Sequence, residues 1–462
     1  MPNLSPQFAP FAERMRAEGL PDIAIRTFEH YYRQLIKGET GLIPETEITP
    51  VDSLPDAETF SEQLAQAGQA TLSKTILLKL NGGLGTSMGL TKAKSLLTVK
   101  NGLSFLDIIA RQAIEIGIPL VLMNSFSTQA DSLAALEKYP DLPGHVPLDF
   151  VQHKIPKIAQ ADFSPAEWPQ EPDLAWCPPG HGDIYTALVT SGLLNRLLDA
   201  GYKYAFVSNA DNLGAVMDTA ILGYLAENRI PFMIEVAGRT GADKKGGHLA
   251  YRNGQLILRE SAQCPAEDEA AFQDVGRHKY FNTNNLWLNL PALKAVLEAN
   301  NNILGLPMIR NAKTLDPRDL ASPPVYQLET AMGSAIAVFE GTQAVRVPRS
   351  RFAPVKTTND LLAIRSDAYT LTGDYRVIAN PARTLDHIVV DLDSRYYKMI
   401  ADLEARFPHG ALSLLECVRL TVEGDIRFGA NVRAKGDVTL TNHSGAQVKI
   451  EDNTLLRGEQ SW

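Results

Sequence analysis

The residues best suited to chemistry in this sequence stand in a glycine-rich loop that is followed by two lysines. Residues 80–95 read LNGGLGTSMGLTKAKS, and they follow an apolar run at 75–79 that predicts a buried strand. The four glycines of the loop lack a Cβ, so a polyanion can approach their backbone N–H groups closely. Lys92 and Lys94 then supply positive charge. A strand, a glycine loop and cations together are suited to binding the base and phosphates of a nucleotide.

Two common phosphate-binding signatures do not fit this loop. A P-loop needs a glycine followed by lysine and then serine or threonine, and no glycine of the loop has that pair after it. The dinucleotide fingerprint fails by one residue, because Met88 stands where the third glycine belongs and Gly89 comes one place late. The next apolar run, 119–123, leads into Asn124 and not into a ribose-binding acid. A nicotinamide or flavin site and a purely structural glycine turn are therefore the weaker interpretations.

Three later stretches carry polar side chains near predicted strands. Gln152 closes one strand and offers a donor and an acceptor, the complement of the N3–H and carbonyl of a pyrimidine. The loop 178–183 contains two prolines and two glycines, so its backbone can lie against a flat ring, and His181 can stack or touch phosphate. Asp211 stands just past the strand 204–208, where open α/β sheets bind ligands and where Mg²⁺ would find a carboxylate. The alternatives are a solvated glutamine, a structural histidine and an aspartate that caps the next helix.

Groups suited to sugar hydroxyls follow in the next part of the chain. Gly247 allows close backbone approach, Glu260 supplies a carboxylate, and the run 281–285 supplies several amides, with Asn282 and Asn284 among them. Carboxylates and amides recognise hydroxyls because they offer two polar atoms each. An asparagine-rich turn without any ligand is the alternative.

A further cation comes much later, at the predicted start of a helix. Lys356 ends an apolar segment, and Thr357 or Thr358 can cap the helix that follows. A cation joined to a helix amino terminus makes a good site for a phosphoryl group. Asp391 and Asp393 form a D-x-D pair of the kind found in glycosyltransferases, but they lie beyond the α/β region, so a role in a turn is favoured.

The string LNGGLGTSMG resembles the nucleotide-binding signature of the UDP-sugar pyrophosphorylases, in the form found in the eukaryotic-type uridylyltransferases of glucose 1-phosphate. Many members of that family have Pro-Lys-Ser where this chain has AKS at 93–95, and the lysine is kept. The run VKTTNDL at 355–361 looks most like the glucose 1-phosphate enzymes. The resemblance extends along nearly the whole chain, from the glycine loop into the C-terminal tail.

This resemblance implies roles for residues at three places. Those at the uracil and the phosphates of the nucleotide are Leu80, Asn81, Gly82, Gly83, Gln152, His181, Gly182 and Asp211. Those that contact the hexose are Gly247, Glu260, Asn282 and Asn284. Those that act on the reacting phosphates are the catalytic cations Lys94 and Lys356, together with Asp211 as the ligand of a Mg²⁺ cofactor.

The reaction implied by the resemblance is the reversible, Mg²⁺-dependent formation of UDP-glucose and pyrophosphate from UTP and glucose 1-phosphate. The sugar phosphate would attack the α-phosphorus of UTP in line with the departing pyrophosphate. Three alternatives stay open: a pyrophosphorylase for galactose or N-acetylhexosamine 1-phosphate, a glycosyltransferase that uses a UDP-sugar, and a catalytically silent UDP-sugar-binding protein. The silent protein is favoured least, because both lysines and Asp211 are present.

The composition limits the partners and the compartment of the protein. The 462 residues include 44 basic and 53 acidic ones with no long basic run, which argues against nucleic acid and anionic membranes as partners. The cysteines Cys177, Cys264 and Cys417 are far apart and suggest neither a disulfide framework nor a zinc site, so a cytoplasmic location is expected. No apolar stretch reaches the length of a membrane span.

The order of the predicted elements indicates an α/β fold. Strands and helices alternate between residues 75 and 236, which predicts a doubly wound, Rossmann-like sheet of the nucleotidyltransferase kind. An Asn-Gly turn at 253–254 then predicts a hairpin, so the sheet becomes mixed. We expect an N-terminal helical segment at 1–70, a catalytic domain at 71–375 and a C-terminal domain at 376–462.

The C-terminal tail shows a six-residue period. Apolar residues stand at Ile426, Val432, Val438, Ile450 and Leu456, all separated by multiples of six. Such a period predicts a left-handed parallel β-helix, although a set of ordinary short strands is the alternative. A short coil with an open end needs a cap or a partner, so the tail could form a homo-oligomer.

Overall fold

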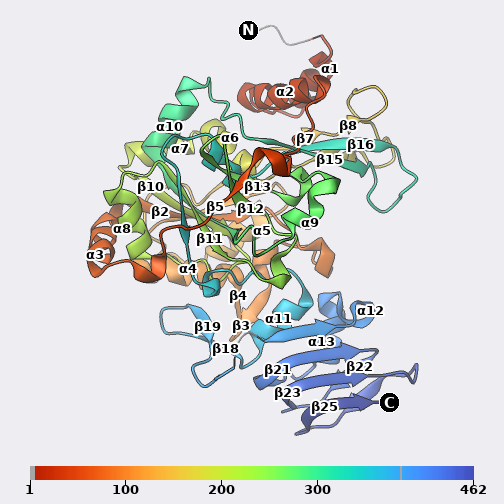
Figure 1. Ribbon diagram of the computed structural model, residues 1–462. Helices are drawn as coiled ribbons and strands as arrows, with labels where there is room; N and C mark the ends of the chain where they lie inside the picture. Colours follow the sequence, from red (N-terminus) through yellow and green to blue (C-terminus); the bar gives the residue numbers. More distant parts are fainter. Residues whose placement is uncertain (1–5, 386–387) are drawn as a thin grey trace.

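In the part of the chain that the computed structural model describes, residues 6–385 and 388–462, ten strands form one mixed sheet at the centre (Figure 1). Its main path runs in the order β1-β12-β14-β10-β2-β5-β6, with β11 beside β14, β17 beside and parallel to β11, and β13 beside β12. The parallel strands are β2 (Thr75–Asn81), β5 (Leu120–Asn124), β6 (Asp149–Val151) and β10 (Tyr204–Asn209). The other strands are β1 (Thr49–Pro50), β11 (Phe232–Gly238), β12 (His248–Arg252), β13 (Gln255–Arg259), β14 (Tyr280–Asn289) and β17 (Gln343–Arg346). The predicted mixed sheet is therefore confirmed.

Helices cover both faces of this sheet, as a doubly wound fold requires. One face packs on α4 (Phe105–Ile116), α5 (Gln129–Leu136) and α8 (Thr219–Glu227). The other packs on α6 (Ile184–Thr190), α7 (Leu193–Asp199) and α10 (Leu290–Ala299). Leu77 belongs to the first core, and its neighbours Ile76 and Leu78 belong to the second. Since β2 is buried on both sides, its sequence is an apolar run and not an alternating pattern.

Two helix boundaries illustrate what the sequence signals can and cannot predict. Helix α4 begins with a capping box between Ser104 and Asp107 and ends at Gly117, whose φ of 76° is left-handed, as predicted from the glycine. The apolar pattern of residues 187–200 predicts a single helix, and this prediction is wrong because the structure has two helices there. Gly192, with φ 71°, separates α6 from α7, because a left-handed residue cannot continue a helix.

The apolar spacing of residues 8–38, interrupted at 19–21, predicts two N-terminal helices, and they are confirmed as α1 (Ala9–Ala17) and α2 (Asp22–Ile36). Phe8, Phe11, Phe28 and Tyr32 stack there with ring centroids 4.9–5.6 Å apart. The strands near these helices are β7 (Ile155–Pro156), β8 (Ile158–Ala159), β9 (Trp176–Cys177), β15 (Met308–Thr314) and β16 (Pro324–Thr330). This aromatic cluster fixes the N-terminal helices on the core.

Helix α3 (Glu62–Thr71) packs directly on α8. The sequence predicts a helical stretch at 57–67. Helix α3 begins five residues later than this stretch, because Ser61 is its N-cap. A Cβ on Gly68 would collide with the carbonyl of Thr219, and one on Gly223 with the carbonyl of Leu64. The two helices are therefore in backbone contact, which only glycine permits at these positions.

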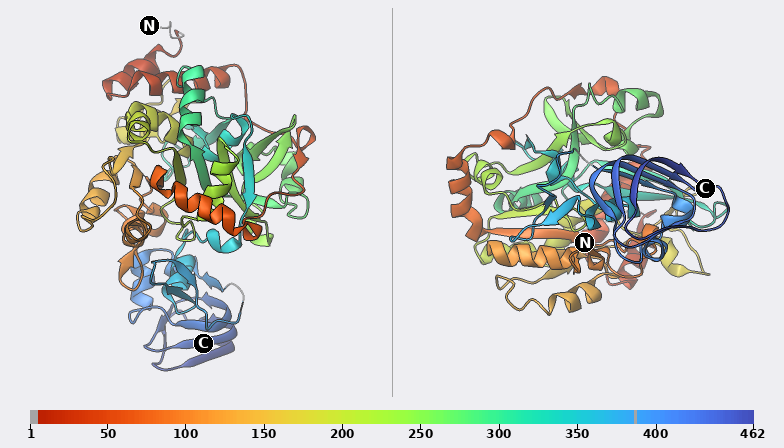
Figure 2. Two further views of the ribbon diagram at one scale, coloured as in Figure 1. Left: turned by 90° about the vertical axis from the view of Figure 1, so that its left-hand side faces the viewer. Right: turned by 90° about the horizontal axis from the view of Figure 1, so that it is seen from below.

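The C-terminal region lies at the opposite end of the molecule from α1 and α2 (Figures 1 and 2). The hairpins β3 (Thr98–Lys100) with β4 (Leu103–Ser104) and β18 (Tyr369–Leu371) with β19 (Val377–Ala379) lie on the approach to it. Its helices are α11 (Thr358–Arg365), α12 (Ser394–Tyr397) and α13 (Ile400–Arg406). Its strands are β20 (Val389–Leu392), β21 (Ser413–Glu423), β22 (Ile426–Phe428), β23 (Arg433–Thr441), β24 (Val448–Ile450) and β25 (Leu455–Ser461), whereas the short helix α9 (Glu269–Phe272) belongs to the body of the molecule. Strands β20, β21, β23 and β25 form one parallel sheet, and β22 and β24 form a second parallel pair.

The six-residue period holds for part of this region only. Leu420 pairs with Val438, a separation of 18 residues that equals three repeats. Ile450, however, pairs with Phe428 and not with the residue class of Ile426. The turn at 442–447 shifts the register between these strands, so the predicted six-residue period does not continue through it.

No helix among residues 6–385 and 388–462 combines the length and apolar character needed to cross a lipid bilayer. The turn role that the sequence favoured for the D-x-D pair is confirmed for Asp393 only, since Asp391 lies in strand β20. Asp393 caps α12 by accepting the N–H of Arg395, and it also accepts the N–H of Gly424. These bonds and the Arg395 guanidinium hold the pKa of Asp393 well below its usual range.

Candidate active site

The glycine loop leaves the carboxyl end of β2 and folds back on itself. Gly85 and Gly89 adopt left-handed φ values of 68° and 76°, which glycine alone adopts without strain. The N–H of Lys94 donates to the carbonyl of Gly83 at 3.0 Å, so the lysine returns to the start of the loop. The loop also contacts the C-terminal region, since a Cβ on Gly89 would lie 3.2 Å from Sδ of Met399.

The first predicted cation and the predicted metal ligand are in direct contact. Nζ of Lys94 lies 2.6 Å from Oδ2 of Asp211, and the two side chains are 15% and 22% exposed. Asp211 follows the end of β10, and the N–H of Ala210 donates to the carbonyl of Leu80 at 3.0 Å. Asp211 does not cap a helix, because Asp218 caps α8. The alternative interpretation of Asp211 as an N-cap is therefore excluded.

The second predicted cation reaches the same place from far along the chain. The N–H of Val355 donates to the carbonyl of Asp211 at 3.1 Å, so Lys356 lies one residue from this contact. Thr357 and Asp360 form a capping box at the start of α11, as predicted for Thr357. The Lys356 side chain is exposed, and its backbone N–H donates to Asp360. The structure thus places the backbone next to Lys356 against Asp211, the partner of Lys94, at the carboxyl edge of the sheet.

Two glycines predicted to bind the base, Gly82 and Gly182, have side chains packed closely against them. A Cβ on Gly82 would lie 3.0 Å from Oε1 of Gln152, so these two residues touch. A Cβ on Gly182 would collide with the hydroxyl of Thr330. The amide of Asn81 is buried and donates to Asn124 and Ser132, so Asn81 can contribute to a ligand site only through its backbone.

His181 has a defined tautomer. Its Nδ1 accepts the backbone N–H of Met332 at 2.9 Å, so the proton of the neutral ring resides on Nε2. Burial lowers the pKa of His181 to about 4. At neutral pH the side chain is therefore an uncharged donor, suited to a hydrogen bond with a phosphate oxygen or a base carbonyl.

We expect the lowered pKa of His181 to make the folded protein less stable in acid. Because the pKa of His181 is lowered on folding, the unfolded chain binds the extra proton first as the pH falls from about 6.5 to about 4, and stability is lost across that range. Urea unfolding of the His181→Gln variant should show a smaller loss of stability between pH 7 and pH 5 than unfolding of the parent protein. Equal losses in both proteins would contradict the assignment.

The residues predicted for the sugar also form one cluster. A Cβ on Gly247 would lie 2.5 Å from Oε2 of Glu260, and Nδ2 of Asn282 donates to Oδ1 of Asn284 at 2.9 Å. Burial raises the pKa of Glu260, while a hydrogen bond from Asn282 and the charge of Lys356 act in the opposite direction. The charge of Lys356 therefore acts on the sugar cluster.

The contact between Gly247 and Glu260 gives a test of the sugar cluster. In Gly247→Ala the new methyl group should displace the Glu260 carboxylate and raise the KM for the sugar phosphate by about tenfold, the cost of one hydrogen bond to a charged group. The KM for the nucleotide should not change. Gly373→Ala is the matched control, since a Cβ there meets nothing within 4 Å. Steady-state kinetics with each substrate varied would detect the difference, and an unchanged KM for the sugar phosphate would contradict the assignment.

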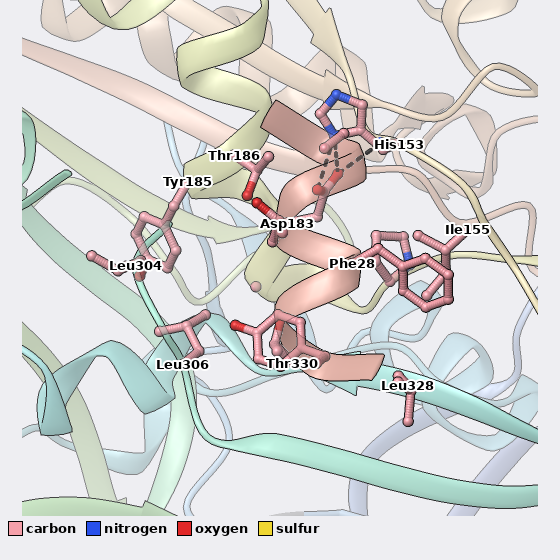
Figure 3. Close-up of a pocket in the computed structure, with 15 residues that line it drawn as sticks. Phe28, His153, Ile155, Asp183, Tyr185, Thr186, Leu304, Leu306, Leu328 and Thr330 are labelled. Carbon is pink, nitrogen blue, oxygen red and sulfur yellow. Dashed lines mark hydrogen bonds and ion pairs between the residues drawn. The ribbon is translucent and has the colours of Figure 1, made fainter. Parts of the chain in front are cut away.

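A small cavity lies next to Gly182, one of the residues predicted for the base, between α2 and the segment 179–186 (Figure 3). Within it, Nδ1 of His153 lies 2.9 Å from Oδ1 of Asp183, and the N–H of His153 donates to the same carboxylate at 2.7 Å. Its volume of about 30 Å³ accommodates roughly two water molecules. Nucleotide pockets are about ten times larger, so this cavity supports the loop and does not hold a substrate.

The donor set at Asp211 suits one kind of metal site. Among residues 6–385 and 388–462, no group of three or more His, Cys, Asp or Glu side chains is arranged to hold an ion. Mg²⁺ in nucleotide sites uses one or two carboxylates and takes its other ligands from phosphate and water. Asp211 fits a magnesium ion that arrives with a triphosphate, and the site does not fit a permanently held metal.

Sequence reasoning missed the residues that hold the site together. Glu235 is fully buried and accepts hydrogen bonds from Arg351, Trp287 and Asn285. A glutamate in the otherwise apolar run 231–236 was the available signal. Asn212, next to Asp211, was visible as a polar residue but had no partner that the sequence could identify.

The glycine loop, the carboxylate and the two lysines at the carboxyl edge of a doubly wound sheet define an α/β enzyme that acts on a nucleotide. A family model described as UTP–glucose-1-phosphate uridylyltransferase matches residues 25–435. The chain belongs to this family.

Individual relatives agree with the family model. The chain is 41% identical over 417 residues to a UTP–glucose-1-phosphate uridylyltransferase of Solanum tuberosum, with 88% of this chain and 84% of the relative covered. It is 39% identical to a probable enzyme of the same name from Schizosaccharomyces pombe, with 83% and 76% covered. A crystal structure of a UDP-glucose pyrophosphorylase variant from Leishmania major in complex with UDP-glucose has a TM-score of 0.91 and 44% identity, with 99% of this chain and 100% of that chain covered.

Proposed function

We propose that this protein forms UDP-glucose and pyrophosphate from UTP and glucose 1-phosphate in a reversible, Mg²⁺-dependent reaction. One observation carries the proposal: Lys94 bonds to Asp211 while the segment of Lys356 bonds to the carbonyl of the same aspartate. The side chain of Lys94 and the backbone next to Lys356 thereby contact one aspartate beside a glycine loop. The UDP-glucose complex of the Leishmania major enzyme supports the choice of product.

The proposed chemistry is a single in-line displacement. An oxygen of the sugar phosphate forms a bond to the α-phosphorus of UTP, and the bond from that phosphorus to the pyrophosphate oxygen breaks. A phosphate monoester is already an anionic nucleophile, so the reaction needs no general base. The main obstacle is repulsion between two anions, which cations and positioning must overcome.

Each cation has a separate part in this scheme. Lys356 bridges the sugar phosphate and the α-phosphate, while Lys94 neutralises the departing pyrophosphate. Asp211 would hold Mg²⁺, which neutralises charge on the phosphate oxygens when it is bound. Because Lys94 is already paired with Asp211, the lysine is held in place before the substrates arrive.

The remaining predicted residues select the substrates. Gln152 and the backbone of residues 80–83 would hold the uracil, and the neutral Nε2–H of His181 would donate to the nucleotide. Glu260, Asn282 and Asn284 would bind the hexose hydroxyls. The packing of Gly247 against Glu260 supports this assignment, because any larger residue would displace the carboxylate.

Release of pyrophosphate is the experiment that separates the candidate functions. The protein should release pyrophosphate with UTP and glucose 1-phosphate, and more slowly or not at all with other nucleoside triphosphates. A higher rate with galactose or N-acetylhexosamine 1-phosphate would assign a different sugar specificity. Release of UDP from a UDP-sugar would identify a glycosyltransferase, and no turnover of any pair would identify a binding protein.

We also propose that the C-terminal parallel strands form a left-handed β-helix through which copies of the chain associate. The parallel pairing and the spacing of 18 residues in β21 and β23 support the coil. Strand β25 is the last strand of its sheet, and the exposed Leu455 lies at its start. Sedimentation of the full chain and of Leu455→Glu over a range of concentrations tests the association. A monomer at every concentration would reject it.

A further inference from the structure

The side-chain amide of Asn212 uses its full capacity for hydrogen bonds, although the residue is only 2% exposed. Its Oδ1 accepts the N–H of Gly214 at 3.2 Å and the N–H of Ala353 at 2.9 Å. Its Nδ2 donates to the carbonyl of Arg351 at 3.1 Å and to Oδ1 of Asn285 at 3.3 Å. The two backbone N–H groups on one side and the carbonyl on the other fix which end of the amide is oxygen.

These partners belong to three separate segments of the candidate site. Asn212 itself follows Asp211, which bonds to Lys94. Arg351 and Ala353 belong to the segment 349–356 that ends at Lys356, and Asn212 forms an isolated antiparallel bridge with Pro354. Asn285 lies in β14, next to the residues predicted for the sugar. One buried amide therefore connects the segment of Asp211, the segment that ends at Lys356 and the strand that carries the residues predicted for the sugar.

Most of the other attachments of the segment 349–356 hold its first residues: Arg349 donates to Asp243, and Arg351 donates to Glu235 and to the carbonyl of Val216. Arg351 anchors one end through its Nε, which donates to Oε2 of Glu235 at 2.8 Å. Glu235 in turn accepts Nε1 of Trp287 at 2.9 Å and Nδ2 of Asn285 at 2.9 Å, so this anchor is rigid. Between the anchor and α11, the bonds of Asn212 and the bond from the Val355 N–H to Asp211 hold the backbone. Loss of the Asn212 amide would remove the acceptor of the Ala353 N–H and one donor to the Arg351 carbonyl, and so loosen the chain directly before Lys356.

We propose that Asn212 is a positioning residue that fixes Lys356 relative to Asp211, an inference that rests on the proposed uridylyl transfer. Asn212 touches no substrate in this scheme and acts only through the position of Lys356. A displacement of about 1 Å in a catalytic group costs up to about 100-fold in rate, so the effect of removing the amide should be large. The effect should also depend on Lys356, because a group that only positions Lys356 has nothing to position when the lysine is absent.

The experiment is a double-mutant cycle with Asn212→Ala, Lys356→Ala and the combined variant. We expect Asn212→Ala to lower kcat by about 10- to 100-fold, with little change in the KM for UTP. In the Lys356→Ala background the same substitution should cause little further loss. An equal loss in both backgrounds would overturn the proposal, because a general structural defect acts with or without Lys356. An unchanged kcat in Asn212→Ala would overturn it as well.

Two further variants test whether the loss of activity in Asn212→Ala is caused by a general loss of folding. Asn212→Asp has the same shape and keeps the acceptor for the N–H groups of Gly214 and Ala353, so it should fold and lose less activity than Asn212→Ala. Asn289→Ala removes another asparagine that bonds to the backbone, the N-cap of α10, at the opposite end of β14. This control should lower the Tm and leave kcat unchanged. A fall in kcat in this control equal to that of Asn212→Ala would overturn the proposal.

A measurement without substrate separates this inference from the proposed function. Hydrogen exchange in the segment 351–356, followed by mass spectrometry, should be faster in Asn212→Ala than in the parent protein. If the parent protein catalyses no uridylyl transfer but the exchange becomes faster, the proposed function fails while the tethering role of Asn212 holds. If the exchange is unchanged, the inference fails whatever the activity.

Discussion

Lys356→Ala should lower kcat for UDP-glucose formation by about 100- to 1,000-fold, which corresponds to about 2.7–4 kcal/mol of lost transition-state stabilisation. The reason is that the charge of Lys356 is needed most when the two phosphate groups approach each other, and less when UTP binds alone. We therefore expect the KM for UTP to change much less than kcat. The same fall should appear in the reverse reaction, because both directions pass through one transition state. Steady-state kinetics in both directions would measure it.

Folding should not be affected by this substitution, since the Lys356 side chain is exposed. The Tm of the variant should equal that of the parent protein. Lys74→Ala is a suitable control, because Lys74 is also exposed but precedes β2 at the opposite end of the sheet. A nearly normal rate for Lys356→Ala would remove Lys356 from the mechanism.

Asp211→Asn should have an effect of similar size, with a fall in kcat of about 100-fold. The substitution keeps the shape of the side chain but removes the charge that pairs with Lys94 and that would hold Mg²⁺. We therefore expect the variant to need a higher Mg²⁺ concentration for half-maximal activity. A titration of activity with Mg²⁺ for both proteins would measure the shift.

The control for this substitution is Asp391→Asn, which neutralises an exposed carboxylate on β20, far from the sheet edge. This variant should show the Mg²⁺ dependence of the parent protein. If Asp211→Asn lost activity but kept the parent Mg²⁺ dependence, Asp211 would act only by orienting Lys94. Such a result would assign the metal to another ligand.

The central sheet could be predicted from the sequence because its signals are local. The apolar runs at 75–79 and 119–123 are buried on both faces, and only strands packed between helix layers have that pattern. The predicted site residues stand at the carboxyl ends of these strands, where the topology of an α/β sheet brings separate segments together. Asp211 and the glycine loop were found in this way.

Other features depend on contacts that no local signal reveals. The break at Gly192 needs a left-handed backbone, and a glycine inside a helical pattern does not by itself specify one. Asn212 bonds to Arg351 across 139 residues of sequence, so its importance appears only after both segments fold. Asn81 illustrates the reverse case, since its position in the loop motif is prominent but its side chain supports the sheet.

The exposed turn at 442–447 has a practical consequence for handling the protein. Its Asn442 side chain closes the turn by donating to the carbonyls of Asp425 and Ala446, while the residues from His443 to Gln447 face solvent. Since the strands on either side already tolerate a change of register here, added residues need not disturb the buried side chains. An epitope or a fluorophore-labelling peptide spliced in after Ser444 should leave the melting behaviour and turnover of the enzyme intact.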